Sequence, residues 1–427
     1  MNKLNYMSIK KYIKKELCRL CQSGKVSKIL TLPKIPIVDA FRPRLHEGID
    51  LEDYPADLYQ CESCGHAQLL DVVNPKILFG DYIYTSSSSP DLDSHFSEYT
   101  NSLMDQFKLC ENSTLIDIGC NDGLFLRKVK EISNAKIFGV DASLQALVEA
   151  RKNQPEVNFI EGFLTQDLAN EIVQKYSGPF DFVTANNVFS HMDEMHEFAI
   201  SCKKLINKNG LFIFEVSYLL DTVRNFVVDY VYHEHLAHHS VKPLKSFLEK
   251  IELKLLMVQR IKPKGGSIRC VAANKNADWA VDDSVDMLIK EEEEAGLYSK
   301  IYFQNWEEQI KFKINDFQIR FKQITDNNPG KIIGYGACPT GSVLLRLLEV
   351  EDQLNLIVDD NPLRNNLLSP SSLIPVKVVT EVNLTDFEVI IILAWRFKEA
   401  IIKNIISNGF KGQVIVPYPN FEMINVK

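Results

Sequence analysis

Short apolar runs alternate with amphipathic stretches over much of the chain. From residue 101, runs such as TLIDIGC, KIFGVDAS, NFIEGFL, FDFVTANNV and GLFIFEV are separated by segments whose apolar residues recur at helical spacing. The alternation returns near residue 331, in KIIGYGACPTGSVLLRLL, LNLIVDDN, VIIILAWRF and GQVIVPYP. Strands that alternate with helices predict a parallel sheet covered by helices. We therefore expect two Rossmann-like α/β domains, over residues 105–275 and 326–427.

The N-terminal part of the chain has a different pattern. Residues 16–70 contain two CxxC pairs, with several prolines between them and little helical periodicity. A loop-rich segment of this kind needs a metal to hold it together, and two CxxC pairs with this gap predict tetrahedral zinc. Redox pairs would require a βαβ context that the segment lacks. We predict a zinc-ribbon-like module over 10–75, with a structural zinc ion held by Cys18, Cys21, Cys61 and Cys64.

Two further segments connect these domains. Residues 76–104 are polar and rich in turn residues, and they include Tyr82 and Tyr84. Residues 276–325 hold an acidic run and four apolar residues at helical spacing, but no strand pattern. The first segment is predicted to be a linker and the second a helical connector that is solvated along much of its length.

Length and charge narrow the class of protein. The chain has 427 residues, which exceeds the roughly 100–200 residues of one domain. A net charge of −8 disfavours a polyanionic partner such as nucleic acid. No run of about 20 apolar residues predicts a membrane span, and the basic N-terminus lacks a signal sequence. We expect a cytoplasmic enzyme that is a monomer or a weak dimer and contacts neither nucleic acid nor membrane.

A glycine turn in the central domain carries the strongest local signal. The sequence DIGCNDG ends an apolar strand and opens a helix, and Asp141 closes the next strand. Gly119 and Gly123 would allow a ligand to approach the helix N-terminus, and Asp141 could accept two ribose hydroxyls. The turn lacks the middle glycine of GxGxxG. It predicts a nucleotide-type cofactor, with an ordinary tight turn as the alternative.

This turn, together with FDFVTANNVFSH after the fourth strand, resembles class I S-adenosylmethionine-dependent methyltransferases. The resemblance implies that S-adenosylmethionine is the cofactor. It places the glycines near the methionine part of the cofactor, Asp141 at the ribose, and the two asparagines near the methyl donor, with Phe163 a weaker candidate for the adenine pocket. The implied cofactor-binding residues are Asp117, Gly119, Asn121, Gly123, Asp141, Asn186 and Asn187.

The segment VDYVYHEHLAHHSV contains four of the nine histidines within seven positions. It is not an HExxH zinc motif, because Ala237 stands where the second histidine would be. Two alternatives stay open: a two-ligand metal site at His235 and His239 if the segment is helical, and a solvated polar cluster. In the functional interpretation a histidine removes a proton from carbon next to a ketone, and tyrosine or histidine donors stabilise the enolate.

Essentially the whole chain resembles bacterial three-domain C-methyltransferases that act on nucleotide-linked 4-keto deoxysugars. The motifs are the paired CxxC, YxYxSSxS, IGCNDG, YHEH, GGSIR, GYGAxxxG and VDDNP followed by LAWRF. The resemblance implies methyl transfer to C-3 of a nucleotide-linked keto-deoxysugar through an enolate that a base generates. It also implies a nucleotide-binding C-terminal domain in which glycines hold the diphosphate.

Individual roles follow from the same resemblance. His235 would be the base, Tyr232 a donor to the sugar oxygen, Glu234 an orienting group, His191 a substrate contact and Tyr84 the linker tyrosine, with Tyr82 as its fallback. The implied substrate-binding residues are Tyr82, His238, Lys264, Arg269, Gly334, Gly336, Gly341 and Asp359.

The chain departs from the family pattern at three places. His238 and His239 follow YHEH where aromatic residues are frequent, which leaves open which histidine is the base. Thr340 stands where a lysine is common, and Lys264 where a histidine is frequent. Arg396 of LAWRF is equally a phosphate contact or a structural partner.

Other functions remain as alternatives. The enzyme could methylate oxygen or nitrogen of a similar sugar. The chain could also be a non-catalytic zinc-ribbon binding protein. The loop GYGACPTG, with VDD about 20 residues later, superficially matches an NAD-linked oxidoreductase, but its glycine spacing fits poorly.

Overall fold

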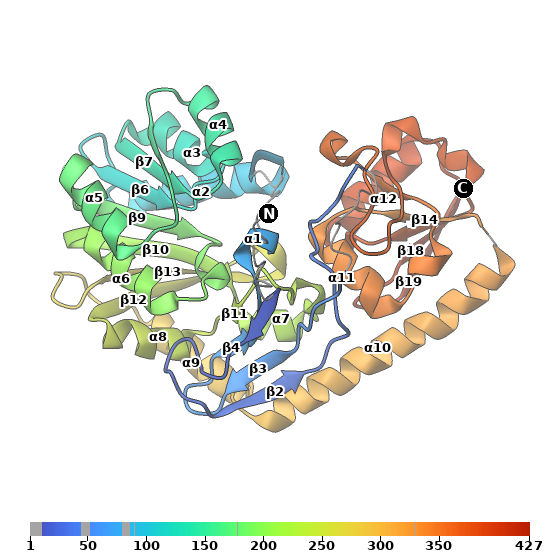
Figure 1. Cartoon of the computed structure of the whole chain (residues 1–427), viewed down its shortest axis with the longest axis horizontal. Helices are drawn as coiled ribbons and strands as arrows, with labels where there is room; N and C mark the ends of the chain where they lie inside the picture. The colour runs from blue at the N-terminus through green and yellow to red at the C-terminus, as the bar shows by residue number, and fades with distance from the viewer. Residues whose placement is uncertain (1–10, 44–51, 79–85, 89, 177, 329) are drawn as a thin grey trace, which may run out of the picture.

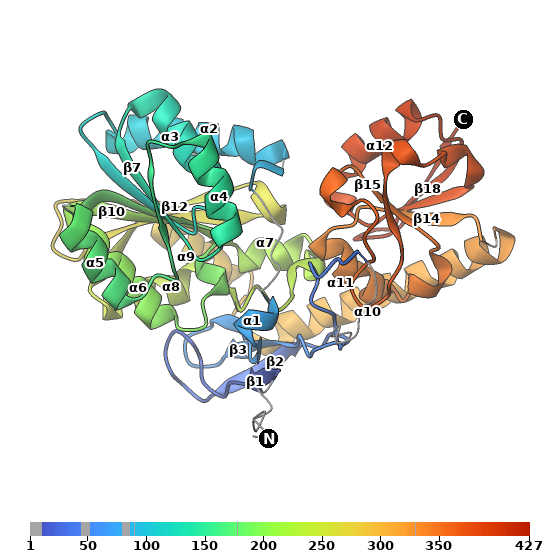
Figure 2. The same ribbon diagram turned by 45° about the horizontal axis from the view of Figure 1, so that its top comes forward.

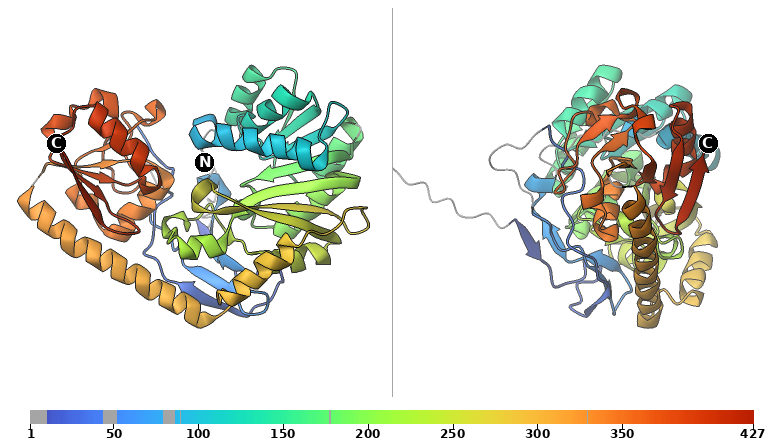
Figure 3. Two further views of the ribbon diagram at one scale, coloured as in Figure 1. Left: turned by 180° about the vertical axis from the view of Figure 1, so that it is seen from behind. Right: turned by 90° about the vertical axis from the view of Figure 1, so that its right-hand side faces the viewer.

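The computed structural model describes residues 11–43, 52–78, 86–88, 90–176, 178–328 and 330–427 (Figure 1). Two α/β domains stand side by side, the N-terminal module lies low between them, and helix α10 runs from that module beneath the C-terminal domain (Figure 1, Figure 3). The largest buried apolar cluster takes residues from all three parts, including Leu58, Phe214 and Ile391. The three parts therefore share packed apolar surface.

The central domain is built on a seven-stranded sheet. Its strand order is β12-β13-β10-β9-β6-β7-β8, and β13 alone runs antiparallel to its neighbours. The parallel sheet confirms the predicted α/β class, and the antiparallel β13 is an addition that the apolar runs did not reveal. The strands are β6 Thr114–Ile118, β7 Lys136–Asp141, β8 Asn158–Glu161, β9 Phe180–Asn186, β10 Ile206–Ser217, β12 Leu253–Ile261 and β13 Ser267–Asn274.

Helices cover both faces of this sheet (Figure 1, Figure 2). The first helix, α2, lies in the second half of the segment expected to be a linker. Its Phe96 and Tyr99 pack against Phe125 of α3, so α2 is part of the central domain's core. The helices are α2 Pro90–Phe107, α3 Leu124–Ser133, α4 Leu144–Asn153, α5 Gln166–Tyr176, α6 Met195–Leu205, α7 Leu219–Arg224 and α8 Val241–Lys250, with 3₁₀ turns η1 Ser86–Ser88, η2 Phe189–His191, η3 Val228–Tyr230 and η4 Pro263–Gly265.

The C-terminal domain has a six-stranded sheet in the order β16-β15-β14-β17-β18-β19, parallel except for β19. The four strands predicted from apolar runs are all present. The elements are β14 Ile332–Tyr335, α11 Pro339–Leu348, η5 Glu351–Gln353, β15 Ile357–Asp359, η6 Pro362–Arg364, β16 Val376–Val378, η7 Val379–Glu381, η8 Leu384–Asp386, β17 Val389–Ile392, η9 Trp395–Phe397, α12 Lys398–Ser407, β18 Gly412–Val416 and β19 Glu422–Val426.

The N-terminal module contains short antiparallel strands. A four-stranded sheet has the order β11-β4-β3-β2, and its strand β11 comes from the YHEHLAHH segment of the central domain. The histidine-rich segment is therefore built into the sheet of the N-terminal module. The elements are β1 Tyr12–Lys14, β2 Val26–Leu30, β3 Leu58–Cys61, β4 Ala67–Leu69, β5 Asp71–Val73, α1 Pro75–Leu78 and β11 Ala237–His238.

The connector forms two helices, α9 Ser284–Glu294 and the long α10 Lys300–Asn327. The acidic run is not wholly solvated. Glu292 is fully buried and accepts hydrogen bonds from the first backbone amides of α8, including that of Val241 at 2.6 Å. This carboxylate satisfies amides that have no partner within α8. No helix among the described residues is long and apolar enough to cross a membrane.

Candidate active site and metal centre

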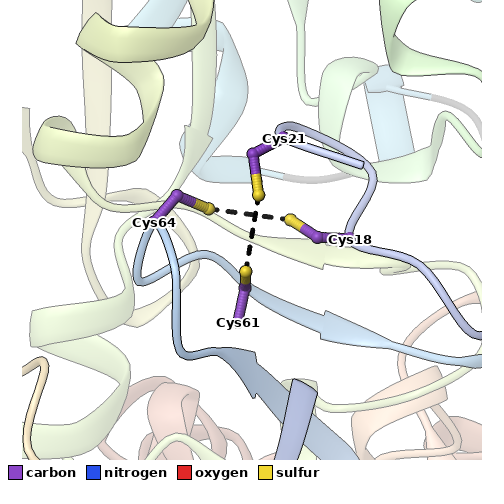
Figure 4. Close-up of side chains that lie close together, drawn as sticks. All are labelled: Cys18, Cys21, Cys61 and Cys64. Carbon is purple, nitrogen blue, oxygen red and sulfur yellow. Dashed lines mark hydrogen bonds between the residues drawn. The ribbon is translucent and has the colours of Figure 1, made fainter. Parts of the chain in front are cut away.

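The four predicted zinc ligands meet at one point of the N-terminal module (Figure 4). The Sγ atoms of Cys18 and Cys64 are 3.6 Å apart, those of Cys21 and Cys61 are 3.5 Å apart, and all four lie within 4.8 Å of one another. A tetrahedral ion with Zn–S bonds of about 2.3 Å requires sulfurs about 3.8 Å apart, so the set fits zinc. The hydrogen bond between Cys18 and Cys64 lowers the pKa of Cys18 to about 5 and raises that of Cys64, so Cys18 is the thiol of this pair that ionises first. Four thiolates leave no open coordination position, which suits a structural ion.

A cavity of about 440 Å³ lies at the carboxyl ends of β6, β7 and β9. Gly119 follows β6 with φ of +72°, and a Cβ atom there would lie 2.3 Å from Cγ2 of Val188. Asn121 and Asn187 also have left-handed backbones, which expose the turn to the cavity. Seven residues expected at the site line this cavity: Gly119, Asn121, Asp141, Asn186, Asn187, His191 and Lys264. The weaker adenine candidate, Phe163, is also on the wall and is 63% exposed.

The chemistry of Asp141 fits a ribose. Its Oδ2 accepts the amide of Asn121 at 2.8 Å, and its Oδ1 accepts the amide of Ser143 at the same distance. Each carboxylate oxygen can accept a second hydrogen bond. Because both oxygens are held by backbone, Asp141 presents fixed acceptors to a pair of vicinal hydroxyls.

Asp117 and Gly123 are not among the residues that line the cavity. Asp117 is buried, and its Oδ1 accepts hydrogen bonds from Thr184 Oγ1 at 2.6 Å and Asn186 Nδ2 at 3.3 Å. Burial raises its pKa to about 8. The side chain orients Asn186, whose buried Oδ1 has no hydrogen-bond partner among the described residues. A contact between Asp117 and the cofactor would therefore run through Asn186.

The linker serines dock on the cofactor turn. The amide of Ser86 donates to Asn121 Oδ1 at 2.8 Å, and that of Ser87 donates to Asp122 Oδ2 at 3.0 Å. Ser86 also lines the cavity. Tyr82 and Tyr84, expected at the substrate site, lie outside the described residues.

His235 is held by three aromatic rings. Its ring centroid lies 4.2 Å from that of Tyr230, 4.2 Å from that of Tyr232 and 5.1 Å from that of His191. Its Nδ1 is 2.8 Å from the carbonyl oxygen of Tyr230. A carbonyl only accepts, so Nδ1 carries the hydrogen and Nε2 keeps a lone pair. Burial lowers the pKa of His235 well below its ordinary value, with the neighbouring His191 and Lys264 acting in the same direction.

Two ionisable groups, His191 and Lys264, act on His235, and Glu234 directly precedes it in the chain. The buried Nε2 of His191 and Oε1 of Glu234 have no hydrogen-bond partners among the described residues. Burial lowers the pKa of His191 to about 3 and raises that of Glu234 to about 8. Burial also lowers the pKa of Lys264 to about 8, against the opposing charges of Glu215 and Glu234. The arrangement combines a base, a cation and unpartnered polar atoms beside the cofactor cavity.

Three family models together match most of this chain. "C-methyltransferase C-terminal domain" matches residues 262–419, "Methyltransferase domain" matches 116–212, and "Putative zinc binding domain" matches 18–79. C-methyltransferase NovU from Streptomyces niveus is 26% identical over 417 residues, which cover 96% of this chain and 97% of NovU. The three domains of this chain match those of three-domain C-methyltransferases. The chain is an S-adenosylmethionine-dependent enzyme with a zinc-binding N-terminal domain.

Other relatives match only part of this C-methyltransferase. Malonyl-[acyl-carrier protein] O-methyltransferase of Halalkalibacterium halodurans is 34% identical over 109 residues, covering 24% of this chain and 39% of that protein. Among solved structures, magnesium protoporphyrin IX methyltransferase from Synechocystis with bound SAH gives a TM-score of 0.35 at 16% identity, over 46% of this chain and 90% of that one.

The remaining histidines of the segment tie the C-methyltransferase's central domain to its zinc module. His233 Nε2 lies 3.1 Å from the carbonyl of Pro55, His238 pairs with β4, and His239 packs between Phe189 and His66. All four histidines of the segment are at most 4% exposed, so the alternative of a solvated polar cluster is wrong. The segment is not helical, and His235 and His239 face different neighbours, so the two-ligand metal alternative is wrong as well.

Arg269 has a partner inside the protein. Its Nη2 lies 2.7 Å from Oε1 of the buried Glu215, and its guanidinium lies 3.6 Å from the ring centroid of Tyr99. His95 Nε2 approaches the same carboxylate at 2.8 Å. The structure thus gives Arg269 an internal ion pair, and its substrate contact stays a prediction. Sequence reasoning missed this network, although a lone glutamate in the apolar run GLFIFEV signals a buried pair.

The glycines of the C-terminal loop pack closely. Gly334 lies within β14, facing Leu393, while a Cβ atom on Gly336 would lie 2.6 Å from Cβ of Ala394. A Cβ atom on Gly341 would lie 2.7 Å from the carbonyl oxygen of Gly336. These are packing constraints on the loop, and they leave the predicted diphosphate contact as a proposal.

Asp359 and Arg396 both have partners within the chain. Asp359 accepts the amides of Ala337 at 2.6 Å and of Asn361 at 2.8 Å, so it holds the glycine loop. Arg396 Nη1 contacts both carboxylate oxygens of Asp229, at 2.9 and 3.0 Å. Of the two roles considered for Arg396, the structure shows the structural one.

Proposed function

We propose that this C-methyltransferase transfers the methyl group of S-adenosylmethionine to C-3 of a nucleotide-linked 4-keto-deoxysugar. A carbon next to a ketone carries an acidic hydrogen, so it becomes a nucleophile once a base removes that proton. The sulfonium cofactor, when bound, supplies an electrophilic methyl group. The protein's own residues must then align the acceptor carbon, move one proton and stabilise the enolate oxygen.

Proton removal is assigned to His235. Its Nδ1–H is held by the carbonyl of Tyr230 at 2.8 Å, which leaves the Nε2 lone pair as the acceptor. Because burial lowers its pKa, the ring is neutral at pH 7 and ready to accept a proton. Glu234, one position before, would orient the substrate through its unpartnered Oε1.

The enolate oxygen needs donors, and Lys264 is the cationic one. Lys264 lines the cavity beside His191 and Asn187, and no described residue accepts a hydrogen bond from its ammonium group. An ammonium beside a keto oxygen stabilises the negative charge that develops there. Tyr232, whose ring is 4.2 Å from that of His235, would supply a second donor.

A single observation carries the proposal. Three buried polar atoms around the cavity and the base have no partner among the described residues: His191 Nε2, Asn186 Oδ1 and Glu234 Oε1. Buried polar atoms are normally hydrogen-bonded, and leaving one unpaired costs about 1–3 kcal/mol. A polar acceptor such as a keto sugar, together with the cofactor, would satisfy them.

The nucleotide would bind at the C-terminal domain. Its glycine loop precedes α11, whose first amides can face a diphosphate, and its half-buried thiol Cys338 already accepts the amide of Gly341 at 3.3 Å. Thr340 would replace a lysine contact with a hydroxyl. Gly336, with φ of +108°, gives this loop its tight turn.

The proposal is tested with a substrate panel. The protein is mixed with S-adenosylmethionine and dTDP-, GDP- or CDP-linked 4-keto-6-deoxyhexoses, and the products are analysed by mass spectrometry and NMR. We expect one sugar nucleotide to gain one CH₂ unit, with the new methyl carbon attached to C-3. Binding of both ligands without any methylated product would contradict the proposal, and a methyl group on oxygen or nitrogen would replace it with the alternative.

A further inference from the structure

Arg396 connects the C-terminal domain to the segment that carries His235. It lies in η9, the turn after β17, and its Nη1 contacts both carboxylate oxygens of Asp229. The indole Nε1 of Trp395 donates to Asp229 Oδ2 at 3.0 Å. Asp229 has no exposed surface, so these donors satisfy a fully buried charge. A buried carboxylate held by two donors from another domain fixes η3 firmly in place.

Asp229 is directly followed by the residue that orients the base. Tyr230 accepts the Nδ1–H of His235 through its carbonyl at 2.8 Å, and its ring stacks on the His235 ring at 4.2 Å and 23°. The guanidinium of Arg396 also lies 5.8 Å from the Tyr230 ring centroid. Displacement of Asp229 would therefore move both groups that set the tautomer and the direction of His235.

The same arginine lies against the turn that carries Lys264. A Cβ atom on Gly265 would lie 3.6 Å from Cδ of Arg396 and 2.9 Å from Val227. The side-chain Nδ2 of Asn225, three positions before the histidine segment, donates to the carbonyl of Gly265 at 3.0 Å and so joins this turn to the chain that leads into the segment. One side chain of the C-terminal domain thus abuts both elements that hold the reactive groups.

On its other side, η9 is joined to the glycine-rich loop. The amide of Leu393 donates to the carbonyl of Tyr335 at 2.8 Å, and Gly336 packs against Ala394. Helix α11, which follows the loop, packs on η3 itself. A continuous set of contacts therefore runs from the glycine loop through η9 and α11 to η3 and His235.

We infer that Arg396 is a positioning residue: its ion pair with Asp229 is the contact through which the C-terminal domain holds His235 for proton removal. The inference rests on the proposed function only in calling His235 the base. It predicts that breaking the pair releases the ring from the Tyr230 carbonyl, while the cofactor cavity, formed by other strands, keeps its affinity.

The first readout does not need a substrate. Protein labelled with ¹⁵N-histidine is titrated by NMR, and the His235 signals are assigned by their loss in His235→Asn. In the wild type we expect the Nδ1–H tautomer and a pKa well below the ordinary value. The groups facing the ring are His191, Lys264, His238, the Tyr230 carbonyl and the rings of Tyr230 and Tyr232, and none of them is changed by the test.

The variants are chosen to separate positioning from folding. In Arg396→Gln we expect mixed tautomers and a His235 pKa that rises toward about 6.5 as water reaches the ring. Asp229→Asn combined with Arg396→Gln avoids a lone buried charge and keeps the test valid if the single variant unfolds. The matched control is Arg346→Gln, which removes another ion pair between domains, to Asp53 at 2.8 Å, and leaves Asp229, Trp395 and Arg396 unchanged.

Turnover supplies the second readout. With the sugar nucleotide that the panel identifies, Arg396→Gln should lower kcat about 10–100-fold with the Kd for S-adenosylhomocysteine unchanged, and Arg346→Gln should stay within about twofold of the wild type. His235 signals in Arg396→Gln that match those of Arg346→Gln would overturn the inference. If no sugar nucleotide is methylated but the His235 signals still change in Arg396→Gln, the proposed function is overturned. The positioning of His235 by Arg396 then still stands.

Discussion

Each of the two Rossmann-like domains begins with a glycine turn. The two turns have the same hydrogen-bond pattern, but their surroundings differ. In each, the acid that ends the second strand accepts an amide of the turn: Asp141 holds Asn121 at 2.8 Å, and Asp359 holds Ala337 at 2.6 Å. The central turn opens onto a cavity of about 440 Å³. The C-terminal turn is followed by α11, which packs on η3 and whose Ser342 Oγ donates to the carbonyl of Val38 in the zinc module at 3.0 Å.

The difference shows that a motif alone does not define a ligand site. What surrounds the turn decides whether it only opens onto a cavity or also helps to join the domains. In the central domain, left-handed Asn121 and Asn187 and the end of β9 leave an open wall. In the C-terminal domain, the helix after the turn also serves as the joint that holds the domains together.

The largest effect is expected from removing the metal centre, because both domains pack on the zinc module. Cys61→Ser should abolish binding of the single zinc ion and unfold the module, and with it the sheet that contains β11. Metal analysis and circular dichroism measure this. The exposed Cys110→Ser is the control and should keep full zinc content. Full occupancy in Cys61→Ser would contradict the four-cysteine site.

The next largest effect tests whether proton removal takes place in the central domain. His235→Asn should lower kcat by about 10²–10⁴-fold, the usual contribution of a general base, with little change in cofactor affinity. Steady-state kinetics and calorimetry measure the two quantities. The matched variant is His238→Asn, which changes a histidine of β11 in the sheet of the N-terminal module. A larger loss of kcat in this variant would transfer the role of base to His238.

The paired acids test the comparison directly. Asp141→Asn should weaken binding of S-adenosylhomocysteine about 10–100-fold, because a hydrogen bond to a charged group contributes about 1.5–3 kcal/mol. Asp359→Asn should leave this Kd unchanged and raise KM for the sugar nucleotide. Calorimetry measures the Kd for S-adenosylhomocysteine in both variants. Equal losses of cofactor affinity would show that the two turns are not separate sites.

The alkaline limb of the pH profile tests Lys264. Its pKa is lowered to about 8, so the ammonium is charged below pH 8 and is neutralised as pH rises through that value. If this charge holds the enolate, kcat at pH 9 should be about tenfold below the plateau. In Lys264→Arg, whose side chain stays charged, that limb should disappear from the pH 7–10 range. An unchanged limb would assign it to another group.

The smallest effect is expected at the joint between α11 and the zinc module. Ser342→Ala removes one hydrogen bond, to Val38, and should lower the free energy of unfolding by about 1 kcal/mol with normal turnover. Urea denaturation measures the change. A large loss of activity in this variant would mean that the joint also controls the chemistry.

Local patterns predicted the strands, the four zinc ligands and the glycine turn, because each depends on residues close together in the sequence. The same patterns could not predict that YHEHLAHH completes the sheet of the zinc module, since β11 and β4 are more than 160 residues apart. The solvated interpretation of the histidines failed for this reason. Arg269 and Asp359 stay predicted substrate contacts, but the fold also gives them internal partners, Glu215 and Ala337, that the local patterns did not reveal.

Asp229 shows what further signal the sequence contained. It is a single charge within the apolar run FVVDYVYH, and such a charge predicts a buried ion pair. Its partner, Arg396, lies 167 positions away, so only the fold identifies it. A single charged residue within an apolar run therefore indicates a buried ion pair, and here that pair joins two domains.

The central claim, that an enolate forms at this site, is tested most directly by solvent exchange. The protein is incubated in D₂O with S-adenosylhomocysteine, which carries no methyl group to transfer, and the sugar nucleotide that the panel identifies. Deuterium at C-3 is then followed by NMR. We predict uptake at C-3 with the wild type and its loss in His235→Asn. Absence of exchange by a wild-type protein that still methylates the sugar would contradict the account.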